Sequence, residues 1–281
     1  MKLVRFGDAG AEKPGILDGD GNIRDLSGHI SDIGPEEVTP AGLEKIEGID
    51  VSGLPTAPAG ARIGAPVTGM RNFIAVGLNY EDHARETGAP IPEEPILFNK
   101  LANCIVGPND NVIMPRASKK LDWEIEIAFV IGKKTQYVSE ADALSHIAGY
   151  CICNDVSERH FQAERSGQWM KGKSFESSGP LGPWLVTPDE IADVQNLAMS
   201  LDVNGQRMQT GNTNTMIFSI QHLVHYISQF MVLEPGDVVT TGTPPGVGLG
   251  MDPQVFLKVG DTMTLEIEGL GRQEQKVVEP R

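Results

Sequence analysis

Residues 121–127 read LDWEIEI and continue without a break into the apolar segment AFVIG at 128–132. Successive side chains of a β-strand point to opposite faces, so the spacing predicts one apolar face and one face that carries Asp122, Glu124 and Glu126. Carboxylates are poor strand formers, and a solvent-exposed face is the simplest explanation of this pattern. The apolar continuation instead indicates a central strand, in which buried carboxylates require a counter-ion.

The composition limits the possible functions. The chain has 281 residues, enough for one large domain or for a large and a small one. Its formal net charge of -15 argues against nucleic acid or an anionic membrane surface as a partner. No apolar run reaches the roughly 20 residues of a membrane span, and the start MKLVRFGDAG lacks the apolar core of a signal peptide. We therefore expect a soluble cytoplasmic protein.

The first part of the chain is predicted to form a small α+β domain. The turn DGDGN at 18–22 indicates a β-hairpin, and residues 39–49 have the pattern of a helix. The segment 53–67 is rich in Pro, Gly and Ala and is typical of a linker. We place a small N-terminal domain with its linker at 1–66 and the main domain at 67–281.

The main domain alternates short strand-like runs with Gly and Pro turns, and it shows few helical patterns. The clearest helical pattern covers 215–233 and ends at EPGD. Three cysteines do not make a disulfide framework, and we interpret Cys151 and Cys153 as buried thiols rather than metal ligands. The balance predicts a mainly β (α+β) fold, a large β-roll or sandwich instead of alternating βαβ units.

Three carboxylates form a candidate metal site. Glu124 and Glu126 lie about 6.6–7 Å apart along a strand by backbone rise, and Asp155 follows the apolar run IAGYCICN directly. A set of oxygen donors without His or Cys suits Mg²⁺, Mn²⁺ or Ca²⁺ better than Zn²⁺. From spacing alone, a structural role for these residues stays open.

The residues after Asp155 could hold an anionic substrate. Arg159 and Gln162 share a face with Asp155 if this segment is helical, and Lys171 and Lys173 follow in a Gly-punctuated loop. Lone cations are usually solvated, but cations beside a metal could bind a carboxylate and stabilise developing charge.

Two further segments carry possible catalytic groups. His83 and Glu86 are three residues apart, so one helical turn would let the carboxylate orient the imidazole, although such a pair is more often structural. The segment TTGTPPGVGLG at 240–250 could present backbone N–H groups and the Thr243 hydroxyl to an anion. It matches neither a dinucleotide fingerprint nor a P-loop.

Taken together, several segments closely resemble the fumarylacetoacetate hydrolase family. They span residues 71–250 and occur in the family's order: GLNYEDHARE, DWEIEIAFVIG, CNDVSERHFQ, GKSFESSGPLGPW, NTMIFSI and LEPGDVVTTGTPPGVG. The resemblance implies a mixed β-sandwich roll with a small N-terminal domain, and a homodimer. It also implies Mg²⁺ or Mn²⁺ held by Glu124, Glu126 and Asp155, which leaves Asp122 outside the ligand set.

The resemblance assigns roles to the remaining candidates as well. It implies a catalytic dyad of His83 and Glu86 on a segment that is often a lid in such proteins. The expected catalytic set also includes Lys173 and Gln162. The substrate-binding residues that we expect are Arg159, Thr243 and Tyr80.

The activity that we expect is hydrolysis of the C3–C4 bond of a 2,4-diketo acid to pyruvate and a carboxylic acid, with 2,4-diketo-3-deoxy-L-rhamnonate or L-fuconate as favoured substrates. Alternatives on the same site are decarboxylation of an oxaloacetate-like 2-oxo acid and isomerisation of a 2-hydroxy-diene-dioate, because fold and ligands do not choose among them. A ureidoglycolate lyase and a non-catalytic dicarboxylate-binding protein are weaker alternatives.

Overall fold

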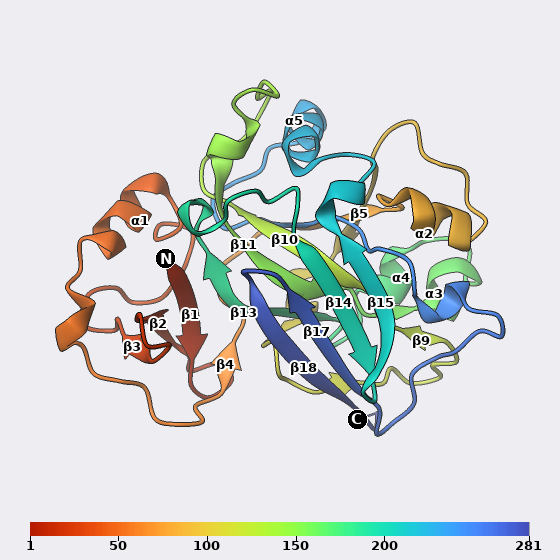
Figure 1. The fold of residues 1–281 in the computed structure, drawn as a ribbon, viewed down its shortest axis with the longest axis horizontal. Coiled ribbons are helices and arrows are strands. Elements are labelled where there is room, and N and C mark those ends of the chain that lie inside the picture. Colours follow the sequence, from red (N-terminus) through yellow and green to blue (C-terminus); the bar gives the residue numbers. More distant parts are fainter. Residues whose placement is uncertain (281) are drawn as a thin grey trace.

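Two β-sheets pack face to face and build the core of the protein (Figure 1), whose computed structural model describes residues 1–280. The larger sheet has the order β3-β2-β1-β13-β11-β10-β16-β5-β6, with β4 beside β1 and β7 beside β13. The smaller sheet has the order β15-β14-β17-β18-β8, and β9 pairs separately with β12. This arrangement confirms the predicted mainly β class and mixed β-sandwich roll.

The strands of the larger sheet are β1 (Lys2–Phe6), β2 (Lys13–Leu17), β3 (Ile23–Asp25), β4 (Ile63–Gly64), β5 (Phe73–Gly77), β6 (Ile96–Lys100), β7 (Ile105–Val106), β10 (Ile125–Ile131), β11 (Ile147–Asn154), β13 (Gly179–Val186) and β16 (Val238–Thr240). Those of the smaller sheet are β8 (Val112–Ile113), β14 (Ala198–Val203), β15 (Gln206–Asn212), β17 (Thr262–Ile267) and β18 (Gly271–Val278). The separate pair is β9 (Leu121–Asp122) with β12 (Ser157–Glu158).

Strand β10 is central and buried along its whole length. Its alternation gives one face to the core between the sheets, through Ile125, Ile127 and Phe129. Its other face continues with Ala128 and Val130 into a second apolar cluster below the N-terminal segment. The two faces therefore differ in function as well as in packing, because the carboxylates described below lie at the start of the second face.

The predicted single strand across 121–131 is divided in two, because the backbone leaves the sheet between β9 and β10. Side chains take the N–H groups there: Asp122 accepts from Trp123 N, the Asn154 side chain from Glu124 N, and the Gln209 side chain from Ile125 N. Buried N–H groups need a partner, and these side-chain acceptors replace a strand neighbour.

The N-terminal segment extends the larger sheet, because β1 pairs with β13 of the main part of the chain. The predicted hairpin is present as β2 and β3, which pair antiparallel. The predicted helix is α1 (Pro40–Glu47), and Thr39 caps its N-terminus by accepting from Gly42 N. This segment lies on the opposite side of the molecule from α2, α3 and α4 (Figure 1).

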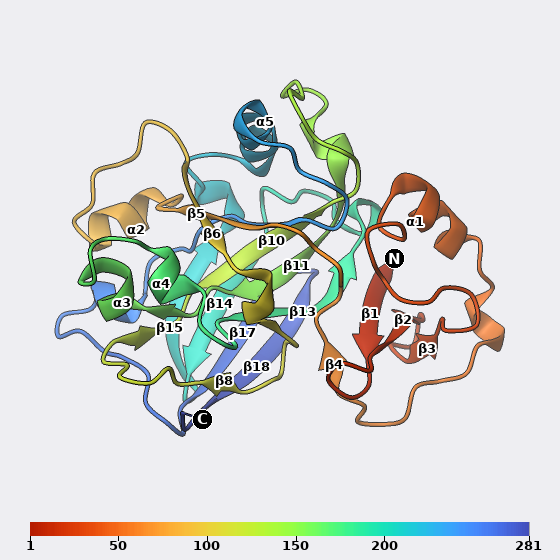
Figure 2. The same ribbon diagram turned by 180° about the vertical axis from the view of Figure 1, so that it is seen from behind.

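The other helices are α2 (Glu81–Glu86), α3 (Arg159–Ala163), α4 (Met170–Lys173) and α5 (Ile220–Phe230). Seen from behind, α2, α3 and α4 gather beside β5 and β6 (Figure 2). Helix α5 is shorter than the predicted 215–233, because Ser219 caps it by accepting from His222 N. Within residues 1–280, none of the helices is long and apolar enough to cross a bilayer. Cys104, Cys151 and Cys153 are free and buried thiols.

Candidate active site

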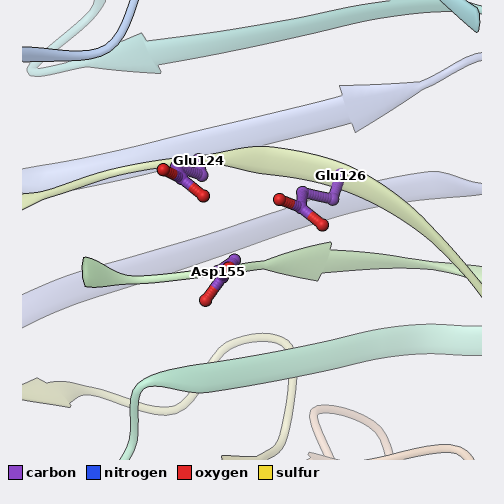
Figure 3. A group of neighbouring side chains, drawn as sticks. All are labelled: Glu124, Glu126 and Asp155. Atoms are coloured by element: carbon purple, nitrogen blue, oxygen red, sulfur yellow. The ribbon is translucent and has the colours of Figure 1, made fainter. Parts of the chain in front are cut away.

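Glu124, Glu126 and Asp155 come together as one buried carboxylate cluster, with a ligand oxygen of each within 4.8 Å of the others. The two glutamates lie at the start of β10, and Asp155 directly follows the neighbouring strand β11 (Figure 3). Antiparallel pairing of β10 with β11 places Ile125 opposite Asn154, which brings the three acids to the same edge of the sheet. Such a set of oxygen donors can bind a hard divalent cation.

Two cations lie against this cluster on the side of α3 and α4. The ammonium of Lys173 is 2.8 Å from Glu124 Oε2 and 2.7 Å from Asp155 Oδ2. Arg159 Nη1 is 2.7 Å from Glu124 Oε1. Burial raises the pKa of Glu124, but the charges of Lys173 and Arg159 outweigh burial and hold this pKa well below its ordinary value.

Glu126 has a different environment, although it is only two residues away. Its carboxylate accepts a hydrogen bond from Gly242 N at 3.0 Å. Burial, together with repulsion from Asp155 and Glu124, raises the pKa of Glu126 well above its ordinary value. The cluster is therefore short of positive charge at Glu126, which is the condition under which a divalent cation would stabilise it.

A third cation, Lys100 at the end of β6, was not predicted from the sequence. Its fully buried ammonium is 2.8 Å from Asp155 Oδ1 and donates to the backbone carbonyls of Lys173 and Ser178. Lys100 thereby fixes both Asp155 and the backbone that carries Lys173. The signal in the sequence is a lysine that ends an apolar strand, ILFNK, but its partners are more than 50 residues away.

Arg159 connects Asp122 with Gln162 and with Glu124 of the carboxylate cluster. Its Nε donates to Asp122 at 2.8 Å, and its Nη1 donates to the Gln162 side-chain oxygen at 3.1 Å. Arg159 Nη2 is buried and finds no hydrogen-bond partner within the described chain, and Arg159 is one of the cavity-lining residues. Asp122 also accepts from the backbone N–H groups of Gly248 and Leu249. It therefore holds Arg159 in place, and it is not part of the carboxylate cluster of Glu124, Glu126 and Asp155.

His83 and Glu86 form the predicted contact on helix α2, with Nδ1 of the imidazole 3.2 Å from Glu86 Oε2. The other Glu86 oxygen accepts from Gly246 N at 2.9 Å. The carboxylate is thus held by the 240–250 loop and in turn orients the imidazole. With Nδ1 directed at Glu86, the opposite ring nitrogen is the one that can act on a substrate or a water.

A cavity with a volume of about 220 Å³ joins these groups. Its polar lining includes these residues of the predicted site: His83, Glu124, Glu126, Arg159, Gln162, Lys173 and Thr243. Glu86 and Asp155 lie behind them and are not among the lining residues. Its apolar lining was not predicted and consists of Val76, Leu78, Ala89, Phe98, Ala163, Trp169 and Leu249. Lys171 is absent from this lining; it donates to the Arg165 carbonyl and faces a different surface hollow.

Two predicted substrate contacts are engaged elsewhere. The hydroxyl of Thr243 lines the cavity but donates to the Ile125 carbonyl and accepts from the Gln209 side chain. Tyr80 is buried in the core between the sheets, with its hydroxyl 3.4 Å from the sulfur of Met199. Tyr80 is not among the cavity-lining residues, although burial, together with the charge of Glu126, raises the pKa of its phenol.

Comparison with known proteins agrees with this geometry. The model of the family described as "Fumarylacetoacetate (FAA) hydrolase C-terminal" matches residues 72–278. The chain belongs to the fumarylacetoacetate hydrolase family. The match covers the smaller sheet, the strands of the larger sheet from β5 onward in the chain, and all the cavity-lining residues, so the resemblance seen in the sequence motifs is confirmed.

Three members illustrate the range of the fumarylacetoacetate hydrolase family. A protein of Burkholderia cenocepacia (strain HI2424) named "Putative hydrolase" is 54% identical over 98% of both chains. The maleylpyruvate hydrolase from Sphingobium sp. SYK-6, solved with manganese(II) and pyruvate, is 27% identical, with a TM-score of 0.84 and full coverage of both chains. The 2-hydroxyhepta-2,4-diene-1,7-dioate isomerase from Mycobacterium marinum is 32% identical, with a TM-score of 0.78 and coverage of 99% and 98%.

Proposed function

We propose that this protein is a Mg²⁺- or Mn²⁺-dependent hydrolase that cleaves the C3–C4 bond of a 2,4-diketo acid to pyruvate and a carboxylic acid. The observation that carries this proposal is that His83, which contacts Glu86, lines the same cavity as Glu124 and Glu126 of the carboxylate cluster. Proton removal from water and stabilisation of an enolate are the two tasks of this reaction, and the cavity holds groups suited to both. The Sphingobium relative named as a maleylpyruvate hydrolase supports the same chemistry.

The metal would be held by Glu124, Glu126 and Asp155, whose oxygens already converge. When bound, it would supply Lewis-acid stabilisation of negative charge on the 2-oxo acid end of the substrate. Manganese in the Sphingobium relative supports a cation of this class. The unpaired Nη2 of Arg159 would bind the substrate carboxylate from the other side, and the Gln162 amide nitrogen would donate to a substrate oxygen.

His83 would act as the general base. Its free ring nitrogen would take a proton from water, and Glu86 would stabilise the resulting imidazolium. The hydroxide oxygen would form a bond to C4, and the C3–C4 bond would then break with its electron pair moving into the enolate of pyruvate. The imidazolium proton would pass to C3, so that the dyad returns to its starting state. Lys173 would stabilise the oxyanion or enolate charge.

Isomerisation of a 2-hydroxy-diene-dioate is the second candidate, because a relative with this name shares the fold. It requires one proton to be moved and no attacking water, so His83 could serve it too. We favour hydrolysis because Glu86 is fixed to both His83 and Gly246, an arrangement that suits a base which must become fully charged. Decarboxylation of an oxaloacetate-like acid would not need the dyad as a base.

The test is pyruvate release from 2,4-diketo acids and oxaloacetate, and loss of the diene absorbance of a hydroxy-diene-dioate, each with Mg²⁺ and with EDTA. We expect EDTA-sensitive pyruvate together with an equal amount of the carboxylic acid. Turnover of oxaloacetate alone would instead establish a decarboxylase, and the base role of His83 would be withdrawn. A homodimer and a cytoplasmic location stay predictions from the sequence.

A further inference from the structure

We propose that the site selects substrates whose acyl arm is apolar, an alkyl or aryl group, over arms that end in a second carboxylate or carry several hydroxyls. The inference rests on the proposed function. It assigns a role in binding the acyl arm to the part of the cavity that takes no part in the reaction itself. It replaces the sugar acids favoured from the sequence with a different substrate class.

The apolar wall begins immediately beyond the catalytic lysine. The ammonium of Lys173 lies 5.3 Å from the centre of the Phe98 ring. The Phe98 ring in turn meets Trp169 edge to face, with ring centres 5.3 Å apart. The order of contacts from the carboxylate cluster outward is therefore lysine, phenylalanine, tryptophan. An acyl arm that extends away from a 2-oxo acid head held at the cluster would lie along these aromatic rings.

Gly77 makes room for the indole at the end of β5. A Cβ atom at this position would lie 2.5 Å from Trp169 Cζ3, a distance that real contacts do not show. The tryptophan ring is thus packed directly onto backbone, and Ala89 and Ala163 add small side chains to the same lining. The small side chains around the Trp169 ring leave space between aromatic and aliphatic surfaces. Surfaces of this kind bind apolar groups.

The charges of the cavity disfavour a second carboxylate. Among the lining residues the Lys and Arg side chains are Lys173 and Arg159, and both are paired with the cluster and directed to the head of the substrate. The other acidic residues of the lining are Glu124 and Glu126 of the cluster and, outside it, Glu164. A carboxylate at the end of the acyl arm would be desolvated without a cationic partner, which is costly.

A hydroxylated arm would also lack partners. Outside the catalytic groups, the polar side-chain atoms of the lining belong to Thr87, Thr243, Glu164 and Trp169. The Thr243 hydroxyl is already bonded to the Ile125 carbonyl and the Gln209 side chain, and the indole N–H of Trp169 is a single donor, too few for several hydroxyls. The Thr87 hydroxyl already donates to the backbone carbonyls of His83 and Ala84, and Glu164 is paired with Lys120 and His160. Hydroxyl groups that leave water for this wall would lose hydrogen bonds, so a polyhydroxylated acid should bind more weakly than an alkyl or aryl one.

The experiment measures dissociation constants by calorimetry on the Mg²⁺-loaded His83→Ala variant, in which the proposed base is absent and the ligand is not consumed. The ligands are 2,4-diketo acids of similar length that carry a phenyl, a terminal carboxylate or a hydroxylated chain. We expect the phenyl compound to bind at least about 10-fold more tightly than the other two. Trp169→Ala should abolish this preference while changing the binding of 2,4-dioxopentanoate, whose arm is only a methyl group, less than about 3-fold. Ala163→Arg should improve binding of the carboxylate-ended acid.

Trp184→Ala is the matched control, because this tryptophan lies outside the cavity lining and should leave the preference intact. Thermal unfolding of each variant confirms that it is folded. Equal or tighter binding of the carboxylate-ended or hydroxylated acid would overturn the inference, and so would an equal loss for the methyl and phenyl compounds in Trp169→Ala. Pyruvate release from the same acids is measured separately with the wild-type protein. If the acids are cleaved but the phenyl compound does not bind more tightly, only this inference is refuted. If the phenyl compound binds more tightly but no acid is cleaved, only the proposed reaction is refuted.

Discussion

At the scale of single residues, neighbouring carboxylates of the site have opposite properties. Glu124 is ionised beside Lys173 and Arg159, while Glu126 is held by a backbone N–H and repelled by the other two acids. The strand brings them to one face, but the cations that pair with Glu124 come from α3 and α4, and Lys100 of β6 pairs with Asp155, so Glu126 has no such partner among the described residues. This asymmetry explains why the cluster needs a further positive charge.

Glu86→Gln tests the dyad. The amide cannot stabilise a charged imidazole, so we expect kcat for hydrolysis to fall roughly 10²- to 10³-fold while substrate binding changes little. Steady-state kinetics and calorimetric binding on the same preparation separate the two quantities. Glu81→Gln, an exposed acid on the same helix, serves as the control. A decrease in binding as large as the decrease in kcat would contradict the assigned role.

The raised pKa of Glu126 predicts a pH-dependent response to metal. A carboxyl group whose pKa is raised on folding stabilises the metal-free protein below its unfolded pKa, and this contribution is lost as the pH rises through the folded pKa. Bound metal removes that loss, because it favours the ionised form. We expect the increase in Tm on adding Mg²⁺ to be larger at pH 8 than at pH 6. An increase that is the same at both values, or larger at pH 6, would exclude this linkage.

At the scale of the elements, the break between β9 and β10 places Asp122 where it can bind other segments of the site. Asp122 ends β9 and receives Arg159 from α3 and two N–H groups from the 240–250 loop. One buried carboxylate therefore joins three segments that come together only in the folded chain.

Asp122→Asn should weaken this junction, because a neutral amide binds the guanidinium less strongly. We expect the free energy of unfolding to fall by about 1–3 kcal/mol and KM for the 2,4-diketo acid to rise, since Arg159 loses its anchor. Denaturant unfolding and kinetics measure the two effects. Asp252→Asn, an exposed site close to the same loop, provides the comparison. Unchanged KM with lowered stability would show that Asp122 does not position Arg159 for binding.

A feature could be predicted from the sequence when the residues that form it are close together along the chain. The faces of β10, the β2–β3 hairpin and helix α1 follow from local patterns, and the structure agrees with them. The strand break could not be foreseen, because Asn154 and Gln209, which cause it, lie 30 and 84 positions from the N–H groups that they bind. The roles of Lys100 and Trp169 escaped prediction for the same reason, and Tyr80 shows that nearness to a motif does not place a side chain in the site.

At the scale of the whole molecule, the N-terminal segment and the main part share one sheet. Strand β1 pairs with β13, and Arg62 forms ion pairs with both Glu12 and Asp110. The apolar cluster below β10 likewise mixes residues of both parts, among them Leu3 and Leu185. The division at residue 66 therefore separates segments of sequence that bury a common core.

A chain that begins at residue 67 should consequently be much less stable than the whole protein. Removal of β1 would expose the edge of β13 and part of this cluster, and unpaired edges promote aggregation. We expect a loss of the cooperative thermal transition, measured by calorimetry. A truncated chain with an unchanged Tm would show that the main part folds independently.

The three buried cysteines have a practical consequence. Cys151 and Cys153 lie in β11 beneath the N-terminal segment, where burial raises the pKa of both thiols, and Cys104 is enclosed in the same cluster. A thiolate is the reactive form of cysteine, so these groups should resist alkylation as long as the core stays closed. The rate at which an alkylating reagent labels these thiols in the wild-type chain therefore reports how often the shared core opens, and no cysteine has to be introduced.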